Sequence, residues 1–572
     1  MEILKGVPAS EGIAIGRIYC YEPQTYTGAE AYFEGDPAAQ IAAFCRAKEH
    51  ALAELSALAE ELSAQYPEQA KIFLAHQEML QDEELTEEVL MRITSQHAAP
   101  EYAVELAISD FAAILSGVND PLIAARVADL MDIKKRLLRN LRGNAEQTLS
   151  HFTEPVIVVT HDLLPSDTAK MDLHHVLGIV TEIGSETSHC AILARSFRIP
   201  ALLGVPNALS KGKCAENGIL DGIGGGELVL DPDSQKIEHA QKRLQAFLSA
   251  RARQDKFLNV EARTQDGVRI EVGINIGSPE EQDAFSQCDF VGLFRTEFLY
   301  MEQDHMPTEE EQYRAYSEVL RRAAGKPVTL RTLDIGGDKT LPYWDLPKEE
   351  NPFLGKRALR LCLENADLFQ TQLRAALRAS AEGPLWIMFP MVGSLDDIRR
   401  AKESLEQAKA SLRLEGIPFD EQIKTGIMIE IPSIALVADL AVQEVDFASI
   451  GTNDLCQYTM AVDRMSPGLR TYYQSLSPAM LRLLHGVISA FRAAGKPISV
   501  CGEMGGDPLA AAALVGMGIQ KLSMGSASIA KVKAALFQIQ LHQAEHAVEQ
   551  AEAVRTEAEA REILSALLAQ DA

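Results

Sequence analysis

The spacing of apolar residues divides the first half of the chain into parts of different character. From residue 31 to 145, apolar residues recur at helical spacing, as in the run AAFCRAKEHALAELSALAEEL. This stretch has room for about four helices, packed as a bundle or as hairpins. The residues on either side instead hold short β-branched runs between polar turns, such as PVIVVT, VLGIVTE and ALLGV. The simplest topology joins residues 1–30 and 146–232 into one α/β domain, with the helical block as an insertion.

The C-terminal part repeats one pattern eight times. Near-continuous apolar runs are separated, in most cases, by segments of helical character; the runs are VRIEVGINI, FVGLFRTEF, PVTLRTLDI, PLWIMFPMV, TGIMIEIPS, FASIGTNDL, PISVCGEMG and IQKLSMGSA. Such strands are typical of a parallel sheet buried on both faces. Eight units in roughly 310 residues predict a (β/α)8 TIM barrel over residues 258–572. The charged residues 233–257 predict a helix that links the α/β domain to the barrel.

Composition narrows the classes of function. A chain of 572 residues is too long for one compact core, and its formal net charge of −27 disfavours nucleic acid and suits a partner with a basic surface. The eight cysteines form no CxxC pair, which indicates reduced thiols and a cytoplasmic protein. The start MEILKGVPAS lacks the features of a signal peptide, and no apolar run approaches the roughly 18 residues of a membrane span. We therefore expect no membrane insertion.

Polar side chains follow most of the eight apolar runs. They are Asn275, Arg295, Arg331, Glu430, Asn453 with Asp454, and Cys501 with Glu503. The carboxyl ends of the strands of a TIM barrel carry the catalytic groups of the enzymes that use this fold. A single polar strand end often marks only the exit from the core. So many charged groups of both signs on one rim favour a chemical site.

The charges on this rim predict a small substrate with several negative charges. Glu430 and Asp454 end successive strands and can together hold Mg²⁺, which leaves positions for water and phosphate oxygens. Arg295, Arg331 and Arg464 add three fixed cations, and a guanidinium group forms paired hydrogen bonds with carboxylate or phosphate.

Cys501 stands at the end of the seventh run, in CGEMGG. A free thiol has a pKa of about 8.5, so it is mostly protonated near neutral pH and can donate a proton to a carbanion or enolate. The ordinary alternative is a small buried hydrophobic residue. The sequence alone leaves both interpretations open.

His189 lies in the stretch GSETSHCAILAR, at the start of a predicted helix. Serine or threonine before it can cap that helix, and a helix N-terminus stabilises an added phosphate group. A neutral imidazole is a good nucleophile toward phosphorus, and a histidine pKa of about 6.5 keeps that form abundant. The pattern predicts a phosphoryl-accepting histidine. A polar residue without a chemical role is the alternative; a metal ligand is disfavoured because no second histidine or cysteine lies at ligand spacing.

Longer motifs carry a resemblance to a known family. The run GSETSHCAILARSFRIPALLGV resembles the phosphohistidine signature of phosphoenolpyruvate-utilising enzymes. The runs GLFRTEFLYM, LRTLDIGGDK, NPFLGKRALR, GIMIEIPS, FASIGTNDLCQYTMAVDR and CGEMGGDP resemble the Enzyme I family of the bacterial phosphotransferase system, the phosphoenolpyruvate–protein phosphotransferases. So do GVPASEGIAIGRIY, FLAHQEMLQDEEL and RVADLMDIKKRLLRNL near the start. The resemblance extends in order over nearly the whole chain.

The resemblance implies an activity and a role for each candidate residue. Phosphoenolpyruvate would phosphorylate His189 on Nε2, and the group would pass to a histidine of the carrier protein HPr, with release of pyruvate, as the first step of sugar phosphotransfer. Cys501 would protonate the departing enolate, and Glu430 and Asp454 would ligate Mg²⁺. The residues implied to bind phosphoenolpyruvate are Arg295, Arg331, Asn453, Asp454 and Arg464. The inserted helices would dock HPr, the α/β domain would carry His189 between the two partners, and the barrel would form a homodimer.

One acidic segment agrees with an HPr-docking role. Seven carboxylates lie between residues 68 and 88 against the single cation Lys71 (Glu68, Glu78, Asp82, Glu83, Glu84, Glu87 and Glu88). A solvated helix face is the ordinary interpretation of such a run. A basic carrier protein would make steering by this patch plausible. We interpret His76, inside the segment, as a structural or interface residue.

The motif around His189 departs from the family pattern, which usually reads Gly-Gly-Arg-Thr-Ser-His. Here Ser185 replaces the second glycine and Glu186 replaces the arginine. A carboxylate there would repel phosphate and raise the histidine pKa. This motivates a second hypothesis, a regulatory or weakly active paralogue that binds partners of the phosphotransferase system without efficient transfer. A pyruvate phosphate dikinase or phosphoenolpyruvate synthase would need a large nucleotide-binding domain, for which the chain has no room.

Overall fold

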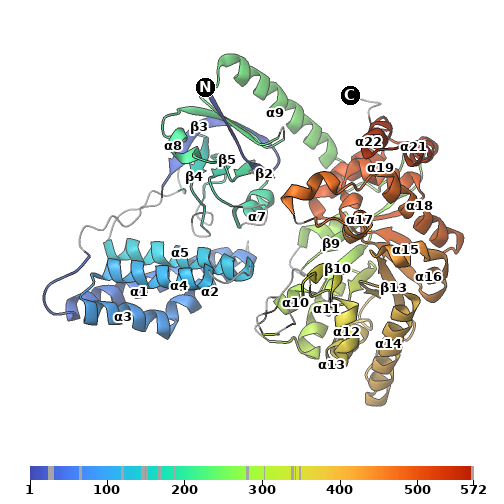
Figure 1. The fold of residues 1–572 in the computed structure, drawn as a ribbon, viewed down its shortest axis with the longest axis horizontal. Helices are drawn as coiled ribbons and strands as arrows, with labels where there is room; N and C mark the ends of the chain where they lie inside the picture. The colour runs from blue at the N-terminus through green and yellow to red at the C-terminus, as the bar shows by residue number, and fades with distance from the viewer. Residues whose placement is uncertain are drawn as a thin grey trace. The chain divides into compact units, whose positions relative to one another are not determined.

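The computed structural model describes residues 1–568 except 23–30, 64–66, 117–120, 143–148, 150–151, 165–166, 168–170, 185–188, 224, 278–281, 302, 304, 337–340, 342, 345, 347–348 and 465. The chain forms two compact units, Met1–Ser249 and Ala250–Ala572 (Figure 1). Each unit is described by itself.

The first unit contains a mixed sheet of eight strands in the order β1-β8-β7-β3-β4-β5-β6-β2. The pairs β3/β4, β4/β5 and β5/β6 are parallel, and the other pairs are antiparallel. The three runs that predicted strands are β4, β5 and β6. The strands are β1 (Glu2–Lys5), β2 (Val7–Ser10), β3 (Ile13–Tyr21), β4 (Val156–Thr160), β5 (Val176–Thr181), β6 (Ala201–Leu203), β7 (Asn217–Asp221) and β8 (Glu227–Leu230).

Alternate side chains of β4 are buried on opposite faces of this sheet, so both faces are covered. Val156 and Val158 share a core with residues of α7 (His189–Ser196), whereas Ile157 and Val159 share a second core with Ala208 of α8 (Ala208–Gly212). All five residues of β4 are buried, as expected for a strand between two layers.

The helical insertion lies between β3 and β4, as predicted, but it contains five described helices where the pattern predicted about four. These are α1 (Ala38–Ser63), α2 (Pro67–Gln81), α3 (Glu83–Gln96), α4 (Pro100–Ser116) and α5 (Pro121–Arg142). The additional break comes from Asp82, whose carboxylate accepts hydrogen bonds from the N–H groups of Glu84 (2.8 Å) and Leu85 (3.2 Å). This side chain caps α3 immediately after α2 ends, inside what reads as one continuous helical pattern.

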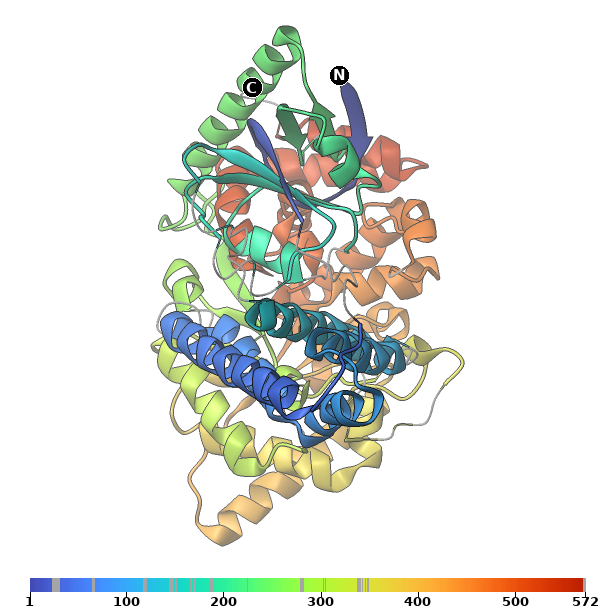
Figure 2. The ribbon, with the colours of Figure 1, turned by 90° about the vertical axis from the view of Figure 1, so that its left-hand side faces the viewer.

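One buried ion pair joins the insertion to the sheet. Lys135 of α5 donates hydrogen bonds to the hydroxyl of Tyr21 (2.6 Å) and to the carboxylate of Asp167. Tyr21, the last residue of β3, also donates to Asp167 at 2.6 Å. Figure 2 shows the helices of the insertion side by side. After β8, helix α9 (Ser234–Asp255) occupies the segment predicted as the linker helix. The exact residue limits of the parts stay predictions.

The second unit is built on a closed barrel in which all eight strand pairs are parallel, which confirms the predicted (β/α)8 class. Each of the eight apolar runs supplies one strand. The strands are β9 (Glu271–Ile276), β10 (Val291–Arg295), β11 (Val328–Arg331), β12 (Leu385–Phe389), β13 (Lys424–Ile429), β14 (Phe447–Ile450), β15 (Ile498–Val500) and β16 (Lys521–Met524).

Helices surround this barrel (Figure 1). They are α10 (Phe298–Met301), α11 (Glu309–Ala323), α12 (Leu359–Glu364), α13 (Ala366–Ala379), α14 (Leu395–Glu415), α15 (Pro432–Leu436), α16 (Ala438–Glu444), α17 (Thr452–Met460), α18 (Pro478–Ala493), α19 (Pro508–Gly516), α20 (Ile529–Leu536), α21 (Leu541–Ala553) and α22 (Glu557–Ser565). Short 3₁₀ helices are η1 (Gln282–Gln287), η2 (Pro352–Leu354), η3 (Pro467–Tyr472), η4 (Glu503–Gly506) and η5 (Ser526–Ser528). Among the residues described, no helix is both long and apolar enough to cross a membrane.

Candidate functional site

The barrel brings two arginines together at the carboxyl ends of neighbouring strands. Arg295 ends β10, Arg331 ends β11, and the two residues are register partners in the sheet. Their surroundings differ. Arg331 is 7% exposed, whereas Arg295 is exposed and forms no ion pair with the residues that the structure describes. Of these two neighbouring cations, Arg331 is therefore buried and Arg295 is accessible.

Two carboxylates that the sequence analysis did not single out hold Arg331. Its guanidinium donates to Glu297, and its Nη1 lies 3.0 Å from Oδ2 of Asp334. Burial lowers the pKa of Arg331, but the carboxylates of Glu297, Asp334 and Glu430 outweigh this and hold the pKa above its ordinary value. Within the described residues, Nε of Arg331 has no hydrogen-bond partner. The sequence could have indicated both carboxylates, because Glu297 in RTEF and Asp334 in RTLD lie just after the ends of two predicted strands.

Arg357 is a second buried cation that the sequence analysis missed. It is 3% exposed, and its Nη2 lies 2.9 and 3.0 Å from the two carboxylate oxygens of Asp334 and 3.3 Å from Oδ2 of Asp454. It follows the 3₁₀ helix η2 in a loop, so a search of strand ends could not find it; its motif, NPFLGKRALR, was the available signal. Gly336 permits the close approach of Arg357 to the rim. Its φ is +106°, and a Cβ on residue 336 would lie 2.7 Å from Cβ of Arg357.

Glu430 and Asp454 are both buried on this rim, at 2% and 6% exposure. Burial raises the pKa of Glu430 to about 8, and repulsion by Asp454 and Asp334 adds to the shift. Oε1 of Glu430 accepts the N–H of Met391 at 2.6 Å, and Met391 has a φ of +54°, which is rare outside glycine. This part of the rim therefore concentrates negative charge and holds strained backbone.

The two carboxylates fit a divalent cation. Oδ1 of Asp454 is buried without a hydrogen-bond partner in the described part of the chain, and hard cations prefer carboxylate oxygens. A cation would also relieve the repulsion that raises the pKa of Glu430. The described residues contain no cluster of three or more His, Cys, Asp or Glu side chains suited to a metal. An ion held by two carboxylates would keep positions for water or for substrate oxygens, as Mg²⁺ commonly does.

The first turn of α17 adds polar groups beside these carboxylates. Asn453 is fixed by two contacts: its Oδ1 accepts the N–H of Glu503 (2.9 Å), and its carbonyl accepts the hydroxyl of Tyr473 (3.3 Å). The loop after β15 approaches this turn closely, because a Cβ on Gly502 would lie only 2.0 Å from Oγ1 of Thr452. A helix N-terminus favours negative charge.

Arg464 lies in the loop after α17. Its side chain is 31% exposed, and its Nη2 is 3.8 Å from Oδ1 of Asp454. Its backbone N–H donates to Gln457 (3.1 Å), while its buried Nε has no hydrogen-bond partner among the described residues. The structure thus places this predicted anion-binding residue next to Asp454. Its Nε–H group is a hydrogen-bond donor that no described residue uses.

Cys501 comes directly after β15 and is 4% exposed. Burial raises the pKa of its thiol to about 11; Ser449, Arg331 and Arg295 act against this shift and Glu430 adds to it. The thiol donates a weak hydrogen bond to the carbonyl of Ile450 at 3.7 Å. A protonated thiol close to cations can donate a proton, because the positive charges stabilise the thiolate that is left.

His189 is the first residue of α7, so the predicted helix start is confirmed. Gly184, with a φ of +116°, ends the described chain before the motif, and Ser185 and Glu186 lie outside the described residues. The next residue, Cys190, is buried, and burial raises its thiol pKa to about 12. This cysteine packs in the core and does not compete as a nucleophile.

The acidic segment of the insertion is largely at the surface. Glu78, Glu83, Glu84 and Glu87 are exposed on α2 and α3. His76 is instead fully buried, with Nε2 3.0 Å from Oδ1 of Asp129. This burial fits the first of the two roles, structural or interface, that the sequence suggested for this histidine.

Comparison with known proteins gives concordant matches over both units. Three family models match: the PEP-utilising enzyme, N-terminal model at residues 5–126, the mobile domain at 152–225 and the PEP-binding domain at 251–541. The phosphoenolpyruvate-protein phosphotransferase of Priestia megaterium is 42% identical over 542 residues, 94% of each chain. That of Bacillus subtilis is 41% identical over 558 residues, 95% of this chain and 96% of the relative. An NMR solution structure of Enzyme I (nEIt) is 36% identical, covers 43% of this chain and 99% of its own, and has a TM-score of 0.37.

Proposed function

The chain belongs to the phosphoenolpyruvate-protein phosphotransferase family, and from that premise we propose that His189 accepts the phosphoryl group of phosphoenolpyruvate and passes it to a histidine of HPr. The protein is a transferase of the phosphotransferase system. The observation that best supports the proposed site is the buried thiol of Cys501 on the same rim as Arg295 and Arg331. Phosphoenolpyruvate carrying labelled phosphate tests the proposal, since the label should appear on His189 in acid-labile form.

We propose that the rim binds phosphoenolpyruvate through its carboxylate and phosphate groups. Arg295 and the Nε atoms of Arg331 and Arg464, which have no hydrogen-bond partner among the described residues, offer guanidinium donors to these anions. Asn453 and the N–H groups at the start of α17 add neutral donors. Glu297 and Asp334 keep Arg331 in place before the substrate arrives, which lowers the entropic cost of binding.

Glu430 and Asp454 would hold Mg²⁺. When bound, the ion would neutralise charge on the phosphate oxygens during transfer. The ordinary deprotonated state of both carboxylates is the one that binds a cation, so metal binding would lower the pKa of Glu430 again.

Transfer then requires a nucleophile and an acid. A neutral imidazole nitrogen of His189 forms the N–P bond while the P–O bond to the enol oxygen breaks, and that bond's electrons stay on the oxygen. The enolate closes to a carbonyl as its C=C electron pair takes the proton of the Cys501 thiol at C3, giving pyruvate. A phosphate on His189 would lie at the N-terminus of α7, which favours negative charge.

For the second half of the cycle we propose that α2 and α3 dock HPr through Glu78, Glu83, Glu84 and Glu87. We also propose a cytoplasmic homodimer formed through the barrel. The paralogue hypothesis depends on Ser185 and Glu186, which lie outside the described residues. Every group that the reaction needs is present in the chain, so efficient transfer is the function that the site supports best.

A further inference from the structure

The interior of the barrel carries a line of small polar side chains on one side. Ser449 of β14 and Ser499 of β15 are register partners. Because side chains alternate along a strand, Cys501 lies on the same face as Ser499, two residues further on. Apolar side chains of Leu293, Met388, Met428 and Phe447 also pack with Cys501, and Met428 is the register partner of Ser449. A polar route and an apolar wall thus meet at the thiol.

Hydrogen bonds connect the members of this line. Oγ of Ser499 donates to Oγ of Ser449 at 2.9 Å. The hydroxyl of Ser449 in turn lowers the pKa of the Cys501 thiol, whose own proton is directed to the carbonyl of Ile450 at 3.7 Å. Ser449 is fully buried and Ser499 is 9% exposed. The hydroxyl groups therefore follow one another from Ser499 through Ser449 toward the sulfur.

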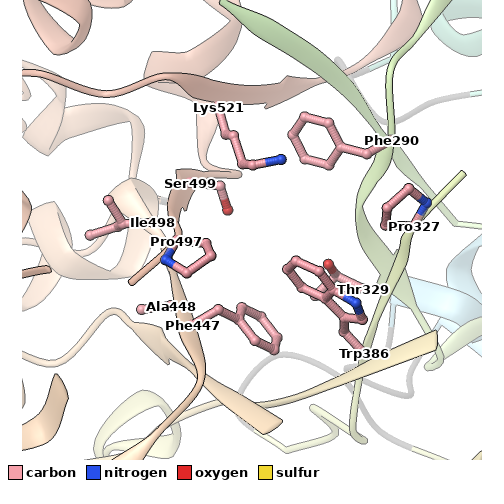
Figure 3. A pocket seen from close by; sticks show the side chains of 10 residues that line it. All are labelled: Phe290, Pro327, Thr329, Trp386, Phe447, Ala448, Pro497, Ile498, Ser499 and Lys521. Carbon is pink, nitrogen blue, oxygen red and sulfur yellow. The ribbon is translucent and has the colours of Figure 1, made fainter. Parts of the chain in front are cut away.

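Ser499 also lines a pocket at the opposite end of the barrel from the rim (Figure 3). This pocket lies among the first residues of the strands: Phe447 begins β14, Lys521 begins β16, and Pro327 and Pro497 precede β11 and β15. In Figure 3 the hydroxyl of Ser499 is on the wall of the pocket, between Lys521 and Phe447. A hydroxyl oxygen that donates one hydrogen bond keeps two lone pairs, so Ser499 can accept a proton donor from this pocket.

The proposed reaction creates a need for such a route. Each phosphoryl transfer removes the proton from Cys501, which is 4% exposed. The new pyruvate and the arginines occupy the rim side of the thiol at that moment. A proton that arrives from the other end of the barrel does not have to pass them.

We propose that Ser449 and Ser499 return the proton to Cys501 from solution at the N-terminal pocket of the barrel. This inference rests on the proposed function. The Sγ–H bond of Cys501 breaks as its proton forms a C–H bond at C3 of pyruvate. The thiolate takes the hydroxyl proton of Ser449, Ser449 takes that of Ser499, and Ser499 takes one from a hydronium ion or protonated buffer molecule in the pocket. Both hydroxyl groups are restored, and the net change is one proton taken from solution.

Isotope exchange separates this route from a purely structural role. The protein, Mg²⁺, phosphoenolpyruvate and carbon-labelled pyruvate are incubated in D₂O without HPr. Carbon label enters phosphoenolpyruvate by forward and reverse transfer alone, because Cys501 can give its proton to one pyruvate and take one back from the next. Deuterium enters C3 only when the thiol exchanges its proton with solvent. The ratio of deuterium uptake to carbon exchange therefore measures proton delivery to Cys501.

The variants Ser449→Ala and Ser499→Ala interrupt the line at two points. We expect carbon exchange to continue while the ratio falls about 100-fold or more, as is typical for loss of a placed proton donor. Ser499→Thr keeps a hydroxyl beside the pocket and should restore the ratio. Ser523→Ala is the matched control, since it removes a buried hydroxyl of β16 that donates to Asn275 and not to the line. If Ser449→Ala does not fold, the comparison of Ser499→Ala with Ser499→Thr decides the question.

Two results would overturn the proposal. An unchanged ratio in the alanine variants would mean that the proton arrives from the rim. A parallel loss of carbon exchange and deuterium uptake would mean that the serines only hold Cys501 in place. Absence of carbon exchange in the unmodified, folded protein would instead refute the proposed function itself, so the two failures are distinguishable.

Discussion

Arg295 and Arg331 are register partners at the ends of β10 and β11, yet Arg331 is buried between two carboxylates and Arg295 is exposed without an ion pair in the described structure. Neighbouring cations normally repel one another. The carboxylates of Glu297 and Asp334 compensate Arg331, which leaves the charge of Arg295 available for an anion. The two arginines should therefore respond differently to substitution.

Arg295→Ala should weaken substrate binding and leave stability unchanged. Loss of hydrogen bonds from a charged group costs about 1.5–3 kcal/mol, or about 10- to 100-fold in KM for phosphoenolpyruvate. The Tm should not move, because no ion pair with a described residue is lost. The control Arg399→Ala removes an exposed arginine that pairs with Glu444 on the barrel surface and should leave KM unchanged. An unchanged KM in Arg295→Ala would remove this residue from the binding site.

Arg357→Met should destabilise the barrel. It leaves Asp334 and Asp454 without the cation that lies 2.9 and 3.3 Å from them, and breaking a buried pair from one side costs about 3–5 kcal/mol. Urea unfolding of the protein measures the loss. The double variant Arg357→Met with Asp454→Asn should recover part of it, because Asp454 then has only Arg464 among the described residues, at 3.8 Å, whereas Asp334 still has Arg331 at 3.0 Å. A single variant as stable as the parent would show that the pair carries no net stabilisation.

Glu430→Gln should separate stability from metal binding. The substitution removes a buried charge that Asp454 and Asp334 repel, so the metal-free protein should be as stable as the parent or more stable. Binding of Mn²⁺, followed by calorimetry as a probe of the Mg²⁺ site, should weaken about 10-fold or more. Asp439→Asn, at an acidic residue in the first turn of α16, is the control. Undiminished Mn²⁺ binding in Glu430→Gln would contradict the proposed ligand.

The thiol of Cys501 should stay protonated at pH 9. Burial raises its pKa to about 11, so in the folded chain it ionises at higher pH than an ordinary thiol of pKa about 8.5. Between about pH 8.5 and 11, the thiol is protonated in the folded chain and ionised in the unfolded chain. Its contribution to the free energy of unfolding is therefore complete below about pH 8.5 and disappears as the pH rises through 11. The thiolate absorbance of the parent minus that of Cys501→Ser measures the ionisation. A full thiolate signal from Cys501 at pH 9 would contradict its role as an acid.

Glu83→Lys with Glu84→Lys should slow transfer to HPr while autophosphorylation continues at its normal rate. Both carboxylates are exposed in the first turn of α3, and opposite charges steer association. The control Glu49→Lys changes an exposed charge on α1 of the same insertion. The rates of label gain and label loss on His189 separate the two steps. Equal slowing of both would mean that the docking surface lies elsewhere.

The fold followed closely from apolar periodicity, because strands buried on two faces and helices between them leave different patterns. The eight apolar runs of the C-terminal part are the eight barrel strands. The predicted number of inserted helices was one too low, because the side chain of Asp82 caps α3 directly after α2. This local contact does not interrupt the helical spacing of apolar residues. Strand-end residues such as Arg331 were predictable from their position. Arg357 was not, since a loop brings it to the rim and the close approach depends on Gly336.

Label transfer from phosphoenolpyruvate tests the central claim most directly. The pure protein is incubated with Mg²⁺ and phosphoenolpyruvate labelled in its phosphate, and protein-bound label and free pyruvate are counted in the same sample. The proposal predicts acid-labile phosphate and pyruvate in equal amounts, both absent in His189→Ala. A folded protein that takes no label, or a His189→Ala variant that still takes it, would contradict the account.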